Sequence, residues 1–384
     1  MSSAENEPVA LWSRVTQAGG ALRALPVELR AEAIACACAT LAIPDAALLR
    51  QLSLSAGLCE PMTRWALATT FGAFSEAALL ELMRSSSERA GSVHGVRGVA
   101  AVLAGNVFTA AARPMLLPLL AGVPVVAKAS SRDDALPYAI ANALSAAQAV
   151  LGAACAVATF SHNDAVRLNA LVAGADCVQV LGSDDAVEGV RDQLRSDQTL
   201  LGRGHGLGLG VALAPTAENA HVFALDVAAY DQRGCLSPHA ILVLGDDAAA
   251  EAFAKLLFDA LGRFEQAMPR GTLPVAAAAE QLQWRGVAAA RGVLHASETF
   301  AVSCEHGAAL RPSPGYRNVG VYSLSSIAAL PERSAPFARF LKALGVAGQA
   351  ELPILAPYTC AAGTMQTPPL SAHLDGLHPL AGFA

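Results

Sequence analysis

The sequence predicts an α/β fold in which a helical N-terminal segment precedes two domains of alternating strands and helices. The chain has 384 residues, enough for two ordinary domains with sizeable hydrophobic cores. Residues 8 to 90 space their apolar side chains as helices do, with Pro26 and Pro44 at the expected joints. From Val93 onward, short β-branched runs alternate with amphipathic stretches, which indicates parallel sheets with right-handed crossovers.

The first alternating block contains four expected strands, at Gly98–Leu103, Val123–Lys128, Ala156–Phe160 and Cys177–Leu181. The expected helices are Ala110–Ala121, Asp134–Leu151, Asn163–Ala173 and one that opens at Ser183 and Asp184. Ser130, Ser131 and Asp133 are candidate caps for the second of these helices. Because ligands on parallel sheets bind beyond the carboxyl ends of the strands, polar residues that follow these strands are candidate site residues.

A glycine-rich stretch at residues 202 to 210 is the expected crossover between the domains. It contains no G-x-G-x-x-G pattern, and a strand-like run follows it where a dinucleotide-binding loop would open a helix. A second block begins near His239, with a strand at Ile241–Leu244 and a helix at Ala248–Met268. We therefore expect domains at residues 1 to 205 and 206 to 350, and a tail at 351 to 384 that returns to the first domain or to an oligomer interface.

Composition and charge exclude several classes of protein. Hydrophobic residues make up 54% of the chain and charged residues 15%, so disorder is not expected. The net charge of -6 is scattered, with no basic block, which argues against a nucleic-acid partner. The polar, acidic N-terminus does not resemble a signal peptide, and the apolar run at Gly98–Ala127 is interrupted by prolines and polar groups. A cytoplasmic protein without an integral membrane segment is expected.

The eight cysteines form no CxxC pair, so neither a metal site nor a redox dithiol is expected. Cys235 differs from the rest because Gly234 precedes it, between an expected helix and an expected strand. A glycine there allows a tight turn that exposes the thiol, and backbone N–H groups at such a turn can stabilise a thiolate or an oxyanion. On these residues alone, a small buried cysteine is an equally good interpretation.

Four segments in order resemble the aldehyde dehydrogenase superfamily. Gln232, Gly234 and Cys235 resemble its nucleophile segment, and Ala104-Gly105-Asn106 resembles the segment with the oxyanion-binding asparagine. The run from Ala121 to Lys128 resembles the strand whose lysine contacts the adenosine ribose, and Gly182-Ser183 resembles the pair beside the cofactor pyrophosphate.

Within the superfamily, two segments resemble the long-chain acyl-CoA reductases of bacterial luminescence systems. These are Ser130-Ser131-Arg132-Asp133 after Lys128, and the tail from Gly363 to Gly376. The resemblance implies two Rossmann-like, three-layer α/β/α domains and a homo-oligomer, either a dimer or a tetramer. It also implies Cys235 as the nucleophile and Asn106 as an oxyanion donor.

The same resemblance implies a cofactor site made of Lys128, Ser130, Ser131, Arg132, Gly182 and Ser183. Relatives that prefer NAD carry a glutamate three positions after the lysine, where it binds the ribose hydroxyls. That position here is Ser131, followed by Arg132. A carboxylate would repel a 2′-phosphate, whereas serine and arginine can bind one, so NADP(H) is the expected cofactor.

Oxidising relatives carry a glutamate base in the glycine-rich segment, but residues 202 to 210 contain no carboxylate, and His205 is not expected to replace it. Without a base for hydrolysis, the acyl-cysteine should exchange with another thiol, which favours NADPH-dependent reduction of an acyl-CoA or acyl-carrier thioester to the aldehyde. One alternative is a reductase of acyl phosphates, similar to γ-glutamyl-phosphate reductase. Another is a catalytically silent assembly subunit of the same fold.

Overall fold

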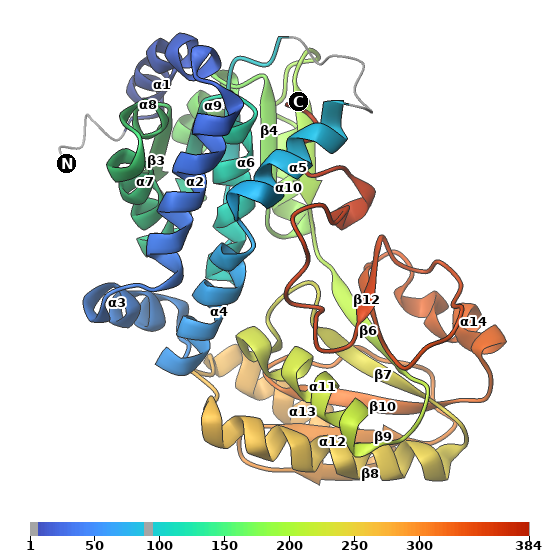
Figure 1. Ribbon diagram of the computed structural model, residues 1–384. Helices are drawn as coiled ribbons and strands as arrows, with labels where there is room; N and C mark the ends of the chain where they lie inside the picture. Colours follow the sequence, from blue (N-terminus) through green and yellow to red (C-terminus); the bar gives the residue numbers. More distant parts are fainter. Residues whose placement is uncertain (1–6, 88–94, 384) are drawn as a thin grey trace.

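The computed structural model describes residues 7–87 and 95–383. Figure 1 shows two lobes, one with the N-terminal helices and the first sheet, the other with the second sheet. Each lobe has helices on both faces of a largely parallel sheet, so the predicted pair of three-layer α/β/α domains is confirmed.

The N-terminal segment is helical, as its periodicity predicts. Five helices precede the first strand: α1 (Pro8–Ala24), α2 (Val27–Ala42), α3 (Ala46–Ala56), α4 (Glu60–Gly72) and α5 (Glu76–Ser87). Pro26 is the N-cap of α2, and Pro44 lies between α2 and α3, because proline favours the ends of helices over their interiors. None of the helices described is by itself long and apolar enough to cross a membrane, although two bent pairs, α2 with α3 and α4 with α5, meet that test jointly.

The first sheet has the order β3-β2-β1-β4-β5, and all its pairs are parallel. Its strands are β1 (Val99–Val102), β2 (Val125–Ala129), β3 (Cys155–Thr159), β4 (Cys177–Leu181) and β5 (Thr199–Arg203). One face packs against α6 (Ala112–Leu120) and α7 (Ala135–Ala147), and α2 packs on the outside of these two helices. The other packs against α1, α9 (Ala165–Ala173) and α10 (Asp184–Arg191). The strand order reverses between β1 and β4, which creates a crevice beyond their carboxyl ends.

Two local expectations for the first domain were wrong. The long helix expected at Asp134–Leu151 breaks at Gln148, whose extended backbone separates α7 from α8 (Ala149–Ala153). None of the candidate caps acts on α7, whose N-cap residue Asp134 makes no side-chain cap. Asp133 instead accepts a hydrogen bond from the Ser55 hydroxyl at 2.9 Å, a tertiary contact that local sequence does not reveal.

The second sheet has the order β12-β11-β6-β7-β10-β9-β8 and is parallel except for the pair β8–β9. Its strands are β6 (Leu207–Ala212), β7 (Pro238–Leu244), β8 (Gly292–Ala296), β9 (Ala301–Glu305), β10 (Asn318–Leu324), β11 (Leu341–Ala347) and β12 (Tyr358–Ala361). Helices α11 (Ala217–Ala228) and α12 (Asp247–Ala267) cover one face. Helices α13 (Val275–Arg291) and α14 (Leu330–Ser334) pack on the other. The strand and helix expected after His239 are therefore present.

The glycine-rich stretch carries the chain from one sheet to the other. β5 ends at Arg203 in the first sheet and β6 begins at Leu207 in the second. The glycines allow close approach, since a Cβ at Gly208 would lie 2.4 Å from the Leu236 carbonyl oxygen and 2.7 Å from the Met365 methyl group. The backbone of the Cys235 loop thus rests directly on β6.

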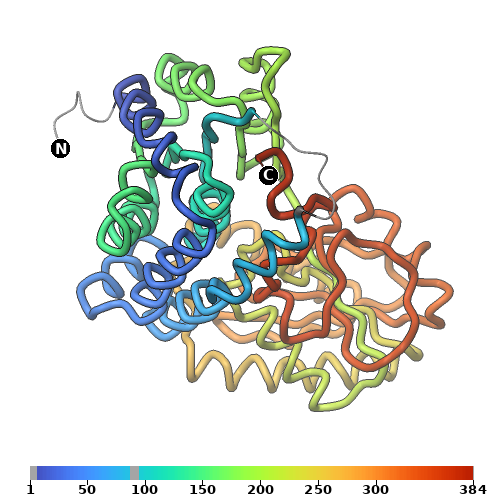
Figure 2. The backbone as a smooth tube through the Cα atoms, turned by 45° about the horizontal axis from the view of Figure 1, so that its top comes forward, coloured from blue at the N-terminus to red at the C-terminus, as the bar shows by residue number. Residues whose placement is uncertain are grey.

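The tail contacts both lobes. Strand β12 pairs with β11 in the second sheet, and the chain then returns to the first domain, where Leu370, Leu380 and Phe383 pack in its core. In Figures 1 and 2 this segment, drawn in red, runs between the lobes. The Arg113 guanidinium donates to the carbonyl oxygens of Pro368, Pro369 and Leu370, at 2.9, 2.7 and 3.3 Å. The partly buried Arg113 side chain therefore ties the tail backbone to the first domain, in addition to the apolar packing of the tail.

We expect Gly208→Ala to destabilise the protein by about 1–3 kcal/mol, because the new methyl group must displace the backbone that leads from Cys235 into β7. The matched control is Gly286→Ala on α13, where an added Cβ meets nothing within 4 Å. That change should stabilise the helix by roughly 0.5–1 kcal/mol. Urea denaturation of both variants measures the difference. Equal stabilities would contradict the packing described for β6.

Candidate active site

Cys235 follows a backbone turn of unusual conformation. The chain leaves α11 through a short 3-10 segment, η3 (Ala229–Gln232), and reaches β7 at Pro238. Tyr230, Asp231 and Gln232 all have positive φ, at 53°, 52° and 59°. Left-handed backbone costs roughly 1–2 kcal/mol for each such residue, so strong contacts must hold this turn.

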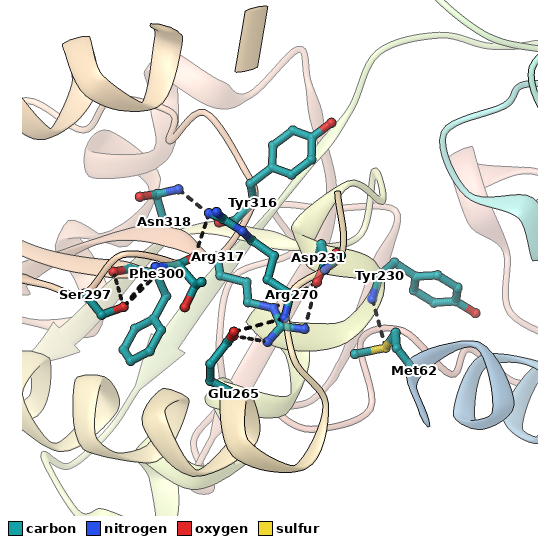
Figure 3. Close-up of polar contacts among 12 residues, drawn as sticks. Met62, Tyr230, Asp231, Glu265, Arg270, Ser297, Phe300, Tyr316, Arg317 and Asn318 are labelled. Carbon is teal, nitrogen blue, oxygen red and sulfur yellow. Dashed lines mark hydrogen bonds and ion pairs between the residues drawn. The ribbon is translucent and has the colours of Figure 1, made fainter. Parts of the chain in front are cut away.

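The second domain holds the turn through a buried ion pair. The Arg317 guanidinium, with only 1% of its side chain exposed, donates from Nε to Asp231 Oδ1 at 2.9 Å and contacts Glu265 at 2.7 Å. The other Asp231 oxygen accepts from the Gly271 N–H at 2.9 Å. Figure 3 shows Asp231, Arg317 and Glu265 pointing toward one another. Both oxygens of the Asp231 carboxylate therefore have hydrogen-bond partners in the second domain.

A second left-handed turn faces the first. Gly315, Tyr316 and Arg317 have φ of 74°, 51° and 63°, and a Cβ at Gly315 would lie 3.1 Å from the Gln232 carbonyl oxygen. The Gln232 amide donates to the Pro238 carbonyl at 2.8 Å and to the Ser313 hydroxyl at 3.3 Å. Gln232, part of the predicted nucleophile motif, therefore bridges the two ends of the cysteine loop.

The first domain holds the same turn from the other side. The Tyr230 hydroxyl lies 2.8 Å from the Thr109 hydroxyl and 3.2 Å from that of Thr70. Arg233 donates to the Ala56 carbonyl at 2.9 Å and to the Tyr230 carbonyl at 3.1 Å. The turn that precedes the cysteine is thus fixed to both lobes.

The structure brings Asn106 and the cysteine loop together. Asn106 follows β1, and its Nδ2 donates to the Arg233 carbonyl at 3.2 Å, two residues before Cys235. A Cβ at Gly234 would lie 3.1 Å from Gln366 Oε1 and 3.7 Å from Val107. The segment after β1, the cysteine turn and the tail therefore meet at one point.

The thiol of Cys235 is exposed, unlike most cysteines of the chain. Cys38, Cys155, Cys177 and Cys304 are buried, and burial raises the pKa of the last three to about 12. Cys235 is reached by solvent, yet the protein around it still raises its pKa by desolvation, helped by the negative charge of Asp375. The charges of Lys342 and Arg203 act in the opposite direction. Cys235 is thus reached by solvent and is also influenced by a cluster of charged side chains.

Asp375 is a site residue that the sequence interpretation missed. Its carboxylate, 16% exposed, forms an ion pair with Lys342 Nζ and lies 3.6 Å from Arg203 Nε. The glycine-rich stretch itself contains no carboxylate. The tail supplies one from 140 positions downstream of the cysteine, beyond the reach of local motif analysis.

The residues expected to bind the adenosine end of a cofactor lie at and after the end of β2. Lys128 is buried there, opposite Val102 of β1, and its Nζ lies 5.5 Å from the centroid of the Phe160 ring. Burial lowers its pKa. Ser130 is partly exposed and sits under Gly105, whose added Cβ would lie 2.5 Å from its hydroxyl. Ser131 and Arg132 follow in an exposed turn.

The expected pyrophosphate residues lie one strand further along. Gly182 follows β4, and Ser183 is the N-cap of α10, where its hydroxyl accepts from the Ala186 N–H at 3.2 Å. Asp184, next in the chain, accepts from the His205 N–H at 2.8 Å, and the His205 ring lies 3.7 Å from the same carboxylate. His205 thus contacts the start of α10. Among the described residues, no group of three or more potential ligands could hold a metal ion.

A second carboxylate that the sequence interpretation missed anchors the tail. Asp226 on α11 is fully buried and accepts from the N–H groups of Gly363 and Met365, at 2.6 and 3.0 Å. Burial raises its pKa to about 7, against the effect of these two donors. The tail beyond β12 therefore depends on a carboxyl group that titrates near neutrality.

The chain matches the family model described as acyl-CoA reductase (LuxC) over residues 73–384. No curated protein sequence matches it. It is similar in structure to an NADP-dependent enzyme from E. coli, at 16% identity and a TM-score of 0.76, over 93% of this chain and 82% of that one.

It is also similar to aldehyde dehydrogenase 21 from Physcomitrella patens, at 14% identity and a TM-score of 0.75, over 94% of this chain and 83% of that one. A third solved structure is an indole-3-acetaldehyde dehydrogenase with NAD+, at 15% identity and a TM-score of 0.73, over 95% and 83% of the two chains. At these identities the likeness shows the fold, and it agrees with the resemblance found in the sequence.

We expect Asp226→Asn to destabilise the protein by about 1–3 kcal/mol at pH 5, because the amide turns an NH2 group toward one of the two backbone N–H groups, whereas the hydroxyl oxygen of a protonated carboxyl can still accept there. Between about pH 4 and pH 7 the native carboxyl holds a proton that the unfolded chain releases, so wild-type stability from this group falls as pH rises. The gap between wild type and variant should therefore narrow from pH 5 to pH 8. Urea denaturation at both pH values measures it, and a gap that widens contradicts the raised pKa.

Proposed function

Because the chain belongs to the acyl-CoA reductase (LuxC) family, we propose that it reduces an acyl thioester to the aldehyde through a covalent acyl-cysteine at Cys235, with NADPH as reductant. The family and the fold already indicate an oxidoreductase that acts on acyl or aldehyde groups. The observation that carries the finer proposal is the exposed Cys235 thiol on a strained turn, with the Asn106 amide 3.2 Å from the carbonyl two residues before it.

In this proposal the two lobes have separate roles. Residues 1 to 205 bind the dinucleotide, residues 206 to 350 carry the nucleophile, and the tail from 351 connects them. The crevice beyond β1 and β4 supports this assignment, since doubly wound sheets bind nucleotides where their strand order reverses. The resemblance further implies a dimer or tetramer and a donor that is either acyl-CoA or an acyl-carrier thioester.

In the first step, the Cys235 thiolate attacks the thioester carbonyl. The new C–S bond forms to Cys235, the old one breaks, and the carrier thiolate leaves and takes up a proton. Asn106 Nδ2 and the Cys235 backbone N–H can donate to the oxygen that becomes negative. Loss of one such donor costs on the order of 10²–10³ in rate. In this scheme, Asp231 and Arg317 keep the nucleophile in place without touching the substrate.

The residues near the crevice fit a phosphorylated dinucleotide. Buried Lys128 pairs with no carboxylate in the described part of the chain, and an exposed turn with Ser131 and Arg132 follows it. Ser183 at the N-terminus of α10 lies where backbone N–H groups favour a phosphate. When bound, the reduced nicotinamide supplies the hydride that converts the acyl-cysteine to the aldehyde. Similar folds include an NADP-dependent enzyme and a dehydrogenase with NAD+.

The absence of a free base supports reduction over hydrolysis. Residues 202 to 210 contain no carboxylate, and His205 is directed to Asp184. Asp375 is the carboxylate whose charge raises the pKa of the Cys235 thiol, and it contacts Lys342 and Arg203. A carboxylate engaged in this way is a poor base for activating water. The acyl-cysteine should therefore react with a hydride or a thiol and not with water.

We expect Cys235→Ala to abolish acyl-CoA-dependent NADPH oxidation, and Asn106→Ala to lower kcat by about 10²–10³. Wild type incubated with acyl-CoA alone should also gain one acyl group at Cys235, detectable by mass spectrometry. The matched control is Cys36→Ala, an exposed cysteine on α2, which should keep full activity. Acyl-CoA of increasing chain length defines the preferred donor.

Two results would redirect this proposal. Faster turnover of an acyl phosphate than of any acyl thioester would favour an acyl-phosphate reductase. No acylation of Cys235 by either class, in protein that is folded, would indicate a catalytically silent subunit.

We expect Ser131→Glu to raise KM for NADPH by about tenfold to a hundredfold, the value of losing a hydrogen bond to a charged group, with a smaller effect on NADH. A carboxylate at this position repels a 2′-phosphate but can accept from a ribose hydroxyl. Arg84→Gln, an exposed arginine on α5, serves as the control and should change neither constant. Steady-state kinetics with both cofactors provides the measurement, and equal losses with NADH and NADPH would refute the assignment of Ser131.

A further inference from the structure

We propose that Asp375, Lys342 and Arg203 form a positioning cluster that sets the charge state of the Cys235 sulfur. The three residues come from the tail, from β11 and from β5, so the cluster exists only when the tail is docked across both lobes. This inference rests on the proposed function, because it concerns the same nucleophile. Thiol reactivity, however, can be measured without substrate or cofactor.

The contacts within the cluster are unequal. Lys342 Nζ forms a close ion pair with Asp375 Oδ1, whereas Arg203 Nε remains 3.6 Å from Oδ2. Arg203 Nε is buried and has no hydrogen-bond partner in the described residues. All three side chains are mostly buried, with 16–21% exposed. A mostly buried group of this kind is weakly screened, so its charges act on neighbours more strongly than surface charges do.

Packing brings the segments that carry the cluster and the cysteine loop together. Leu236, next to Cys235, and Leu374, next to Asp375, pack in one apolar cluster with Met365. Lys342 lies over Gly206, whose added Cβ would be 2.2 Å from its Cγ. Asp375 itself has a φ of 59°, a left-handed conformation that is uncommon for residues other than glycine.

The other charged groups around the loop are engaged elsewhere. The Arg233 guanidinium donates to the carbonyls of Ala56 and Tyr230. His205 contacts Asp184, and Arg113 donates to tail carbonyls. The charges that act on the thiol are therefore those of Asp375, Lys342 and Arg203.

The members of the cluster have opposite effects on the pKa of the Cys235 thiol. The Asp375 carboxylate disfavours a negative sulfur and raises the pKa of Cys235, whereas the two cations lower it. A purely structural ion pair would behave differently, since removal of either partner would loosen the tail in the same way. The sign of the change at Cys235 therefore separates the two roles.

The experiment is the pH dependence of Cys235 alkylation by iodoacetamide in Asp375→Asn and Lys342→Met, in the full chain. Trypsin releases Cys235 as the single cysteine of residues 234 to 255, or of 234 to 263 where Lys255 is replaced, so mass spectrometry can follow it among eight cysteines. We expect the labelling midpoint to move down in Asp375→Asn and up in Lys342→Met. A shift of about 0.5 pH unit changes the labelling rate below the midpoint roughly threefold.

The matched controls are Lys255→Met and Asp259→Asn, which break an exposed ion pair on α12. Both should leave the midpoint where it is in wild type. Lys342→Arg and Asp375→Glu keep the charges and should restore the wild-type midpoint if a neutral variant folds poorly. Shifts of equal sign in the two neutral variants, or no shift in either charge-altered protein that melts like wild type, would overturn the inference. Failure of wild type to oxidise NADPH with acyl-CoA would instead count against the proposed function.

Discussion

The buried pair of Asp231 and Arg317 is the interaction on which the candidate site depends. It holds a turn with three consecutive left-handed residues, a conformation that persists only where the surroundings over-determine it. Glu265 contacts the same guanidinium, so Arg317 has two carboxylate partners and is not an isolated buried ion. The position of Cys235 is therefore a result of packing in the second domain as much as of its own loop.

The two lobes share the task of shaping the site. The second domain supplies the proposed nucleophile and its turn, while the first supplies the Asn106 amide and the partners of Tyr230 and Arg233. The tail adds the Asp375 carboxylate and the Gln366 amide beside Gly234. No single segment contains a complete set of groups. An incomplete fold of either lobe would thus leave an exposed thiol without the groups proposed to direct its chemistry.

Local sequence pattern was sufficient to predict the architecture and part of the candidate site. Apolar periodicity predicted the N-terminal helices and four of the five strands of the first sheet, because these depend on spacing within ten or twenty residues. It missed β5, which runs into the glycine-rich stretch. Gly234 before Cys235 marked the turn, but not its left-handed backbone, which depends on Arg317, 86 positions away. Asp375 and Asp226 escaped notice for the same reason. Each owes its role to a contact with a distant segment, and neither belongs to a pattern that spacing can reveal.

The chain passes between the lobes twice, at residues 204–206 and again after β12, and the two passages are joined by the contact of Arg203 with Asp375. Two adjacent connections restrict the relative rotation of the lobes more than one would, since a rotation that one connection allows can stretch the other. The contacts of Tyr230 with Thr109 and of Arg233 with Ala56 restrict this rotation further. The turn before Cys235 therefore lies where the two lobes have the least freedom to separate.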